Sequence, residues 1–263
     1  GNSYAGISDT TSLSFTTADS LTVSGVNTLM ADMEYKVGSE ITIAVTFSES
    51  VYVSTTEGTP TLELETGSTD RTAIYSAGST TSSLTFTYTV QAGDNSSDLD
   101  YTSTSALSLN GGTIKDSAGN NAILTLASPG ASGSLGASNA LIIDTTAPSA
   151  PTSLTTTSTI TNDNTPKITG AADPSINVEL FDGSTSLGTD VADSSGNFFI
   201  NTSALADGTY SLTAKATDSA GNTSSASTPL SIEIDTISPS VTGVTSTSTD
   251  GTYERGDSVN ISV

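Results

Sequence analysis

The sequence predicts an all-β protein made of tandem antiparallel β-sandwiches. Apolar residues form 34% of the 263 residues and alternate with Ser and Thr in short runs, which is typical of strands with one buried and one solvated face. Turn signals in the second half of the chain are spaced about ten residues apart, as in sandwiches. Two kinds of segment also recur within the chain, and internal repeats indicate tandem modules.

The alternation marks strands in both halves of the chain. In the first half the clearest ones are residues 41–47, 61–65 and 84–90. In the second half we expect strands at 167–169, 177–181, 197–201, 210–217 and 229–234. No stretch of the first half has the period of a helix.

Segment 241–263 repeats segment 23–45. The two align without a gap at an offset of 218 residues, and eight of the 23 positions are identical. The identities include Asp32 and Asp250, Tyr35 and Tyr253, and Gly38 and Gly256. We therefore expect the opening strands of a truncated third module near the end of the sequence.

An apolar strand followed by Asp-Thr and then Pro occurs at 141–149 and again at 232–240, 91 residues later. Proline lacks an N–H and fixes φ, so this motif predicts a stiff exit from a sheet. The predicted organisation is an N-terminal segment or tail of a preceding module at 1–22, a first module at 23–144, a second module at 145–235 and the third module's opening strands at 236–263.

The motif Asp-Ser-Ala-Gly-Asn occurs at 116–120 and 218–222. An Asp side chain accepts hydrogen bonds from backbone two residues later, and Gly and Asn tolerate left-handed backbone. Each copy is predicted to be the hairpin turn between the last two strands of its module.

Several motifs together resemble bacterial immunoglobulin-like repeats of giant surface adhesins and biofilm-associated proteins. They lie at 38–43, 47–51, 58–62, 88–94, 114–120, 144–148 and 164–170. The resemblance covers the chain from about residue 20 onward. It implies tandem immunoglobulin-like antiparallel β-sandwiches, no enzyme activity, and an extracellular place on the bacterial cell surface as a rigid extender.

Tyr210 follows Asp-Gly-Thr at the start of a predicted strand. A tyrosine at this place in immunoglobulin-like sandwiches forms a tyrosine corner, in which its hydroxyl bonds back across the turn. The alternative is an ordinary tyrosine at the edge of the core, with a packed ring and a solvated hydroxyl.

The charge composition excludes several classes of function. The chain has 6 Lys and Arg against 28 Asp and Glu, a net charge of -22, and no His, Cys or Trp. Ser-His-Asp and Cys-His catalysis, disulfides and zinc sites with nitrogen or sulfur ligands are therefore excluded. The six scattered cations form no patch for nucleic acid or an anionic membrane. No apolar run is long enough to insert into a bilayer.

The oxygen ligands that remain suit Ca²⁺. The last hairpin of a sandwich returns to the end where the chain entered, which predicts a structural calcium site at a module junction formed by Asp144, Asp173, Asp218 and Asn222. The same topology predicts a site from Asp19, Glu49, Asp116 and Asn120, and a partial one at Asp235. The alternative is ordinary turn chemistry without metal.

Other acidic segments are predicted to be turns or solvated loops rather than metal sites. They contain Asp94, Asp98, Asp100, Asp163, Asp190 and Asp193. The loop at 93–100 lacks the Gly and closing Glu of an EF-hand.

The favoured function is a non-catalytic extracellular repeat region of a bacterial adhesin, a calcium-stiffened stalk that extends an adhesive tip. Its partners are neighbouring modules of the same chain. One alternative is a subunit of an extracellular filament or surface layer, assembled with other copies of itself by strand complementation. Another is a glycan-binding module, and a glycosidase with two carboxylates is the last.

Overall fold

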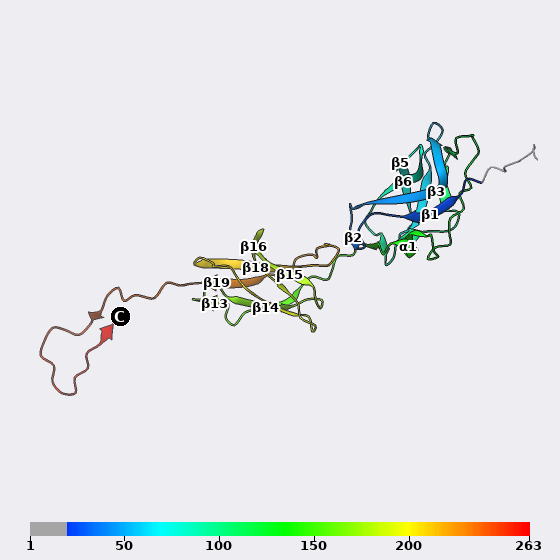
Figure 1. Cartoon of the computed structure of the whole chain (residues 1–263). Coiled ribbons are helices and arrows are strands. Elements are labelled where there is room, and N and C mark those ends of the chain that lie inside the picture. Colours follow the sequence, from blue (N-terminus) through cyan, green and yellow to red (C-terminus); the bar gives the residue numbers. More distant parts are fainter. Residues whose placement is uncertain (1–19) are drawn as a thin grey trace, which may run out of the picture. The chain divides into compact units, whose positions relative to one another are not determined.

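The computed structural model describes residues 20–263, and the all-β prediction is confirmed (Figure 1). The chain divides into two compact units. The first extends to Thr146 and includes Ser219–Asn222, and the second contains Ala147–Asp218 and Thr223–Val263. No helix in the described part of the chain is long and apolar enough to cross a membrane.

The first unit contains a large antiparallel sheet and a small sheet. The large sheet has the order β1 (Val23–Asn27), β3 (Glu40–Ser54), β6 (Thr81–Thr89), β5 (Arg71–Ala77), β4 (Thr61–Glu65) and β8 (Asp100–Tyr101), with β10 (Thr113–Lys115) beside β3 and β9 (Leu107–Ser108) beside β4. The small sheet contains β2 (Glu34–Tyr35), β11 (Ile142–Asp144) and β7 (Asn95–Ser96). The strands predicted in this half of the chain are all present.

The core of the first unit follows from the alternation in β3 and β6. Ile41, Ile43 and Val45 are buried, and the residues between them are less buried or exposed. In the antiparallel register these three residues lie opposite Tyr88, Phe86 and Leu84 of β6, which are also buried. Burying one such aliphatic side chain stabilises the fold by about 1.5–3 kcal/mol.

The first unit has two features that the sequence analysis missed. A one-turn helix, α1 (Leu135–Ser138), begins after Ser134, whose hydroxyl accepts a hydrogen bond from the Ala137 N–H. A single turn is too short to give a helical period in the sequence. Leu21 is buried in the core, so this unit begins earlier than residue 23.

The second unit is a sandwich of two sheets. One sheet contains β12 (Thr152–Thr155), β14 (Lys167–Ala171) and β17 (Asn197–Asn201). The other has the order β13 (Ile160–Thr161), β19 (Leu230–Ile234), β18 (Gly208–Thr217), β15 (Asn177–Asp182) and β16 (Thr185–Val191). Side chains from both sheets form a single core. All five predicted strands are present, and β12, β13 and β16 were missed.

Tyr210 forms the predicted tyrosine corner at the start of β18. Its hydroxyl donates a hydrogen bond to the Ala206 carbonyl oxygen at 2.9 Å. Tyr35 makes the same bond to the carbonyl oxygen four residues earlier, that of Ala31, at 2.8 Å.

Beyond Asp235, the described chain forms two short strands, β20 (Thr245–Ser246) and β21 (Ile261–Ser262). Their antiparallel register places Thr245 opposite Ser262. In the first unit Asn27 lies opposite Ala44, the pair found 218 residues earlier.

The hydrogen bonds of this segment repeat those of 23–45 at the same offset. The Ser246 hydroxyl donates to the Asn260 carbonyl, as the Thr28 hydroxyl donates to the Thr42 carbonyl. Tyr253 donates to the Thr249 carbonyl, as Tyr35 donates to that of Ala31. Segment 241–263 therefore has the backbone arrangement of the first strands of the first unit.

Candidate functional site

The hairpin at 116–120 is held by hydrogen bonds to the carboxylate of Asp116. One oxygen accepts the N–H groups of Ala118 and Asn120, both at 2.8 Å, and the other accepts Asn120 Nδ2 at 2.7 Å. Gly119 has a φ of +93°, which glycine adopts without steric cost. The bonds from Asn120 hold the pKa of Asp116 below its usual value. The predicted hairpin is confirmed, and donors already occupy both carboxylate oxygens.

The second copy of the motif has its turn residues, Ser219–Asn222, in the first unit. Asn222 Nδ2 donates to the Asp144 carbonyl oxygen at 3.0 Å, which confirms the predicted proximity of these two residues. Lys36 Nζ donates to the Gly221 carbonyl oxygen at 2.8 Å. In this arrangement Asn222 presents an N–H rather than an oxygen to Asp144.

The other residues of the predicted calcium sites differ in their exposure. Asp144 and Asp218 are half-buried, Asp173, Asp235 and Glu49 are exposed, and Asp19 lies outside the described residues. Among residues 20–263, no three acidic side chains gather closely enough to hold a metal ion. Calcium binding by these residues stays a prediction.

The chain leaves a sheet through an Asp-Thr segment at 144–145 and again at 235–236, and these two exits have the same local structure. Asp144 Oδ1 accepts the Thr146 N–H at 2.8 Å, and Asp235 Oδ1 accepts the Ile237 N–H at 3.0 Å. Each Asp therefore closes a turn around the Thr that follows it.

A side chain from elsewhere in the same unit binds that Thr. The Thr145 N–H donates to Asn95 Oδ1 at 3.0 Å. The Thr236 N–H and hydroxyl donate to Asp207 Oδ1 at 2.9 and 2.7 Å. Hydrogen bonds from the Thr236 hydroxyl and N–H lower the pKa of Asp207. Each exit is thus fixed to its own unit, by a neutral acceptor in the first and a charged one in the second.

Asp94 lies in a buried polar cluster, so the prediction of a solvated loop is wrong at this position. It is 1% exposed and forms an ion pair with Arg71, whose Nε lies 2.7 Å from Asp94 Oδ1. Asp94 Oδ2 accepts the Tyr88 hydroxyl and the Gln91 N–H. Burial alone would raise the pKa of Asp94, but the donors from Tyr88, Arg71 and Gln91 lower it below its usual value.

The solvated-loop prediction is also wrong for Asp100, which is buried. Its two carboxylate oxygens accept the Tyr101 and Gly130 N–H groups, each at 2.9 Å. The turn prediction for Asp163 and Asp193 is confirmed, because each accepts the N–H two residues later.

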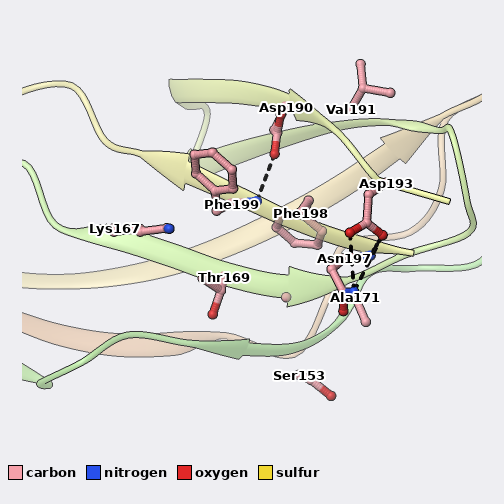
Figure 2. A pocket seen from close by; sticks show the side chains of 11 residues that line it. Ser153, Lys167, Thr169, Ala171, Asp190, Val191, Asp193, Asn197, Phe198 and Phe199 are labelled. Atoms are coloured by element: carbon pink, nitrogen blue, oxygen red, sulfur yellow. Dashed lines mark hydrogen bonds between the residues drawn. The ribbon is translucent and has the colours of Figure 1, made fainter. Parts of the chain in front are cut away.

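A groove on the second unit has a volume of about 590 Å³ and lies over the outer face of β14 and β17 (Figure 2). Phe199 is 53% exposed there, and Lys167 Nζ lies 4.1 Å from the centre of its ring. Asp190, on β16, accepts the Phe199 N–H at 2.8 Å. The groove is lined by two phenylalanines, one cation, the carboxylates of Asp190 and Asp193, one side-chain amide and two hydroxyls, but by none of the predicted metal residues.

The sheets of the second unit, its tyrosine corner and its two-sheet core are those of an immunoglobulin-like sandwich. Residues 139–236 match the family "Bacterial Ig-like domain". This match confirms the resemblance for that segment. The comparison with curated proteins finds no relative of the chain.

The solved structures to which the chain is similar include the BSP domain of a biofilm-associated protein, at 14% identity and a TM-score of 0.28, with 78% of this chain and 29% of that one covered. The fibronectin(III)-like modules of CbhA from Clostridium thermocellum give 20% identity and a TM-score of 0.33, with 81% and 92% covered. The chain thus spans less than a third of the biofilm-associated structure. Similarities this low support no argument about function.

Proposed function

We propose that the chain is a non-catalytic extracellular repeat region of a bacterial surface adhesin, a stalk that holds an adhesive tip away from the cell. The observation that supports it best is the recurrence of the contacts of 23–45 in 241–263, which follows a bacterial Ig-like domain in the sequence. Recurring modules are how repeat proteins build length.

The two exits also support the proposal of a stalk. Each Asp-Thr segment is hydrogen-bonded to a side chain of its own unit before proline follows. Proline restricts the backbone further. A stalk needs such restricted connections, because flexible linkers shorten the mean end-to-end distance.

Small-angle X-ray scattering tests this proposal. The double variant Asn95→Ala, Pro148→Gly removes the acceptor of the Thr145 N–H together with the proline, and is expected to broaden the distribution of interatomic distances and shorten its mean. The control Pro129→Gly changes a proline in a loop of the first unit and is expected to leave the distribution unchanged. If the double variant scatters like the wild type, the exits do not stiffen the chain and the stalk proposal fails.

Calcium stiffening is the finer part of the proposal. A ligand present at about 100 times its Kd adds about 2.7 kcal/mol of stability. We expect Ca²⁺, but not Mg²⁺, to raise the unfolding midpoint, and Asp144→Asn to reduce that rise. Asp163→Asn is the matched control, because Asp163 closes a similar turn. If the unfolding midpoints in Ca²⁺ and in chelator are equal, calcium does not stiffen the chain, and its rigidity comes from the hydrogen bonds and the prolines.

Glycan binding is a second candidate, favoured by the exposed Phe199 beside the groove. Aromatic rings and nearby polar groups suit sugar rings, but Lys167 already lies over this one. Titration with soluble bacterial polysaccharides would detect binding that Phe199→Ala removes. Binding unaffected by that substitution would exclude the groove.

A further inference from the structure

A groove of about 420 Å³ lies on the first unit over β3 and β10. In the antiparallel register Tyr52 lies opposite Lys115, and Ser54 lies opposite Thr113. These four side chains share one face of the two strands, because alternate residues of a strand point to the same side. The groove therefore combines an aromatic ring, an ammonium group and two hydroxyls in a volume typical of small-ligand sites.

The tyrosine of this groove has a free hydroxyl and an uncovered ring. Tyr52 is 46% exposed. Within residues 20–263 it is the only tyrosine whose hydroxyl makes no hydrogen bond, because the others each make one: Tyr35, Tyr75, Tyr88, Tyr101, Tyr210 and Tyr253. The exposed ring of Phe199 in the second unit, by contrast, has Lys167 over it. Both ends of the Tyr52 side chain are thus available to a ligand.

Lys115 is the one lysine that has no partner in the described part of the chain. Lys36 donates to a carbonyl oxygen, and Lys167 and Lys215 lie over phenylalanine rings. No described carboxylate forms an ion pair with Lys115, although the sequence has 28 acidic residues. Lys115 is half-buried, and its ammonium group has three donors and no acceptor. An anionic acceptor is therefore the ligand group that suits it best.

The carboxylate that lines the groove, that of Asp116, is already engaged. It accepts hydrogen bonds from the N–H groups of Ala118 and Asn120 and from Asn120 Nδ2. These donors hold it in the hairpin and offset its charge. The Lys115 ammonium group is left to a carboxylate from outside the chain.

We propose that this groove binds a hexuronate residue of an acidic polysaccharide. The Tyr52 ring packs against the apolar C–H face of the sugar, and Lys115 binds the sugar carboxylate. The hydroxyls of Ser54 and Thr113 bond to the sugar hydroxyls. An aromatic ring alone suits any sugar, whereas the unpaired cation favours one that carries an acid. The groove is separate from the one beside Phe199, and binding here requires neither that groove nor a stalk.

A nuclear magnetic resonance titration of the isotope-labelled protein with a trimer of galacturonic acid tests the site. Chelator is included, because carboxylates of the sugar and of the protein both bind Ca²⁺. Shifts are expected at the amides of 52–54 and 113–119, and added salt is expected to weaken binding by screening the ion pair. No shift at these amides overturns the proposal.

Two further probes separate the sugar from its charge. The methyl ester of the trimer keeps the rings but lacks the carboxylates. It is expected to bind about tenfold more weakly, because a hydrogen bond to a charged group is lost. A glutamate trimer has the charge without the rings and is expected not to bind. Equal binding of the ester, or of the glutamate trimer, overturns the assignment to a hexuronate.

Variants assign the two parts of the site. Lys115→Gln is expected to weaken binding of the acid about tenfold and to remove the difference between acid and ester. Tyr52→Ala is expected to remove binding of both. The matched controls are Lys167→Gln and Phe199→Ala, the cation and exposed ring of the other groove. Binding that survives both changes in the first unit, or that is lost in the controls instead, overturns the proposal.

Discussion

Segments 23–45 and 241–263 share several hydrogen bonds but have opposite environments. Thr28 and Ser246 make equivalent bonds, although Thr28 is buried and Ser246 is exposed. Met30 Sδ accepts the Thr42 N–H, and Ser248 Oγ accepts the Asn260 N–H in the same place. The register therefore depends on residues within the segment, and burial depends on strands elsewhere in the module.

The largest expected difference is between Ile43→Ala and Ile261→Ala. Removing a fully buried Ile costs about 2–5 kcal/mol, because a transfer term and a cavity term add. Substitutions at exposed positions usually change the free energy of unfolding by no more than about 0.5 kcal/mol. Urea unfolding of the first unit, followed by hydrogen exchange, should show a large loss for Ile43→Ala and none for Ile261→Ala. Equal effects would mean that the burial contrast does not exist in solution.

The buried ion pair distinguishes the first unit from the second, because it is the one salt bridge within the described residues. Arg71→Met leaves Asp94 buried without its cation. We expect the free energy of unfolding of the first unit to fall by about 3 kcal/mol. This value is near the low end for broken buried ion pairs, because the Arg71 side chain is 25% exposed. Lys215→Met, at an exposed position on β18, is the control for losing one positive charge. Differential scanning calorimetry would compare them.

The pH dependence of the first unit sharpens this difference. The pKa of Asp94 is lowered in the folded state. Its contribution is therefore fully present above the ordinary Asp pKa of about 3.9 and is lost as pH falls through the lower folded value. Acid unfolding curves of the wild type and Asp94→Asn should converge below that pH. A constant separation would contradict the lowered pKa.

The tyrosine corners should show smaller effects. Tyr35→Phe and Tyr210→Phe each remove one hydroxyl hydrogen bond, and we expect each unit to lose about 1 kcal/mol. Tyr253→Phe removes the equivalent bond from a segment without a core, so neither unit should change. Urea midpoints measured for all three variants provide the comparison.

The smallest expected effect on stability is at the two exits. Their hydrogen bonds should nevertheless respond differently to pH. Thr145 is bound by the neutral Asn95 and Thr236 by the ionised Asp207. As pH falls through the lowered pKa of Asp207, the Thr236 amide should lose protection while the Thr145 amide keeps it. Amide chemical shifts across a pH titration test this, and Asp207→Asn should remove the difference.

The sequence predicted features that depend on local chemistry. The alternation at 41–47, the Asp-Ser-Ala-Gly-Asn hairpins and the Tyr210 corner each depend on residues close in the chain. The cluster of Asp94 could not be read in this way, because Arg71 approaches from a different strand. An acidic loop and a buried ion pair have the same local composition, and only the tertiary fold distinguishes them. Calcium binding by the residues proposed for it stays a prediction.

The 218-residue repeat also has a consequence for the order of folding. The Ser246–Asn260 bond closes a loop of only 14 residues, as does the Thr28–Thr42 bond. Loops of this size close in about 0.1 μs and hairpins form in about 1–10 μs, much faster than a ribosome adds residues. The first strands of a module therefore have time to pair during synthesis, before the residues that will bury them have been added.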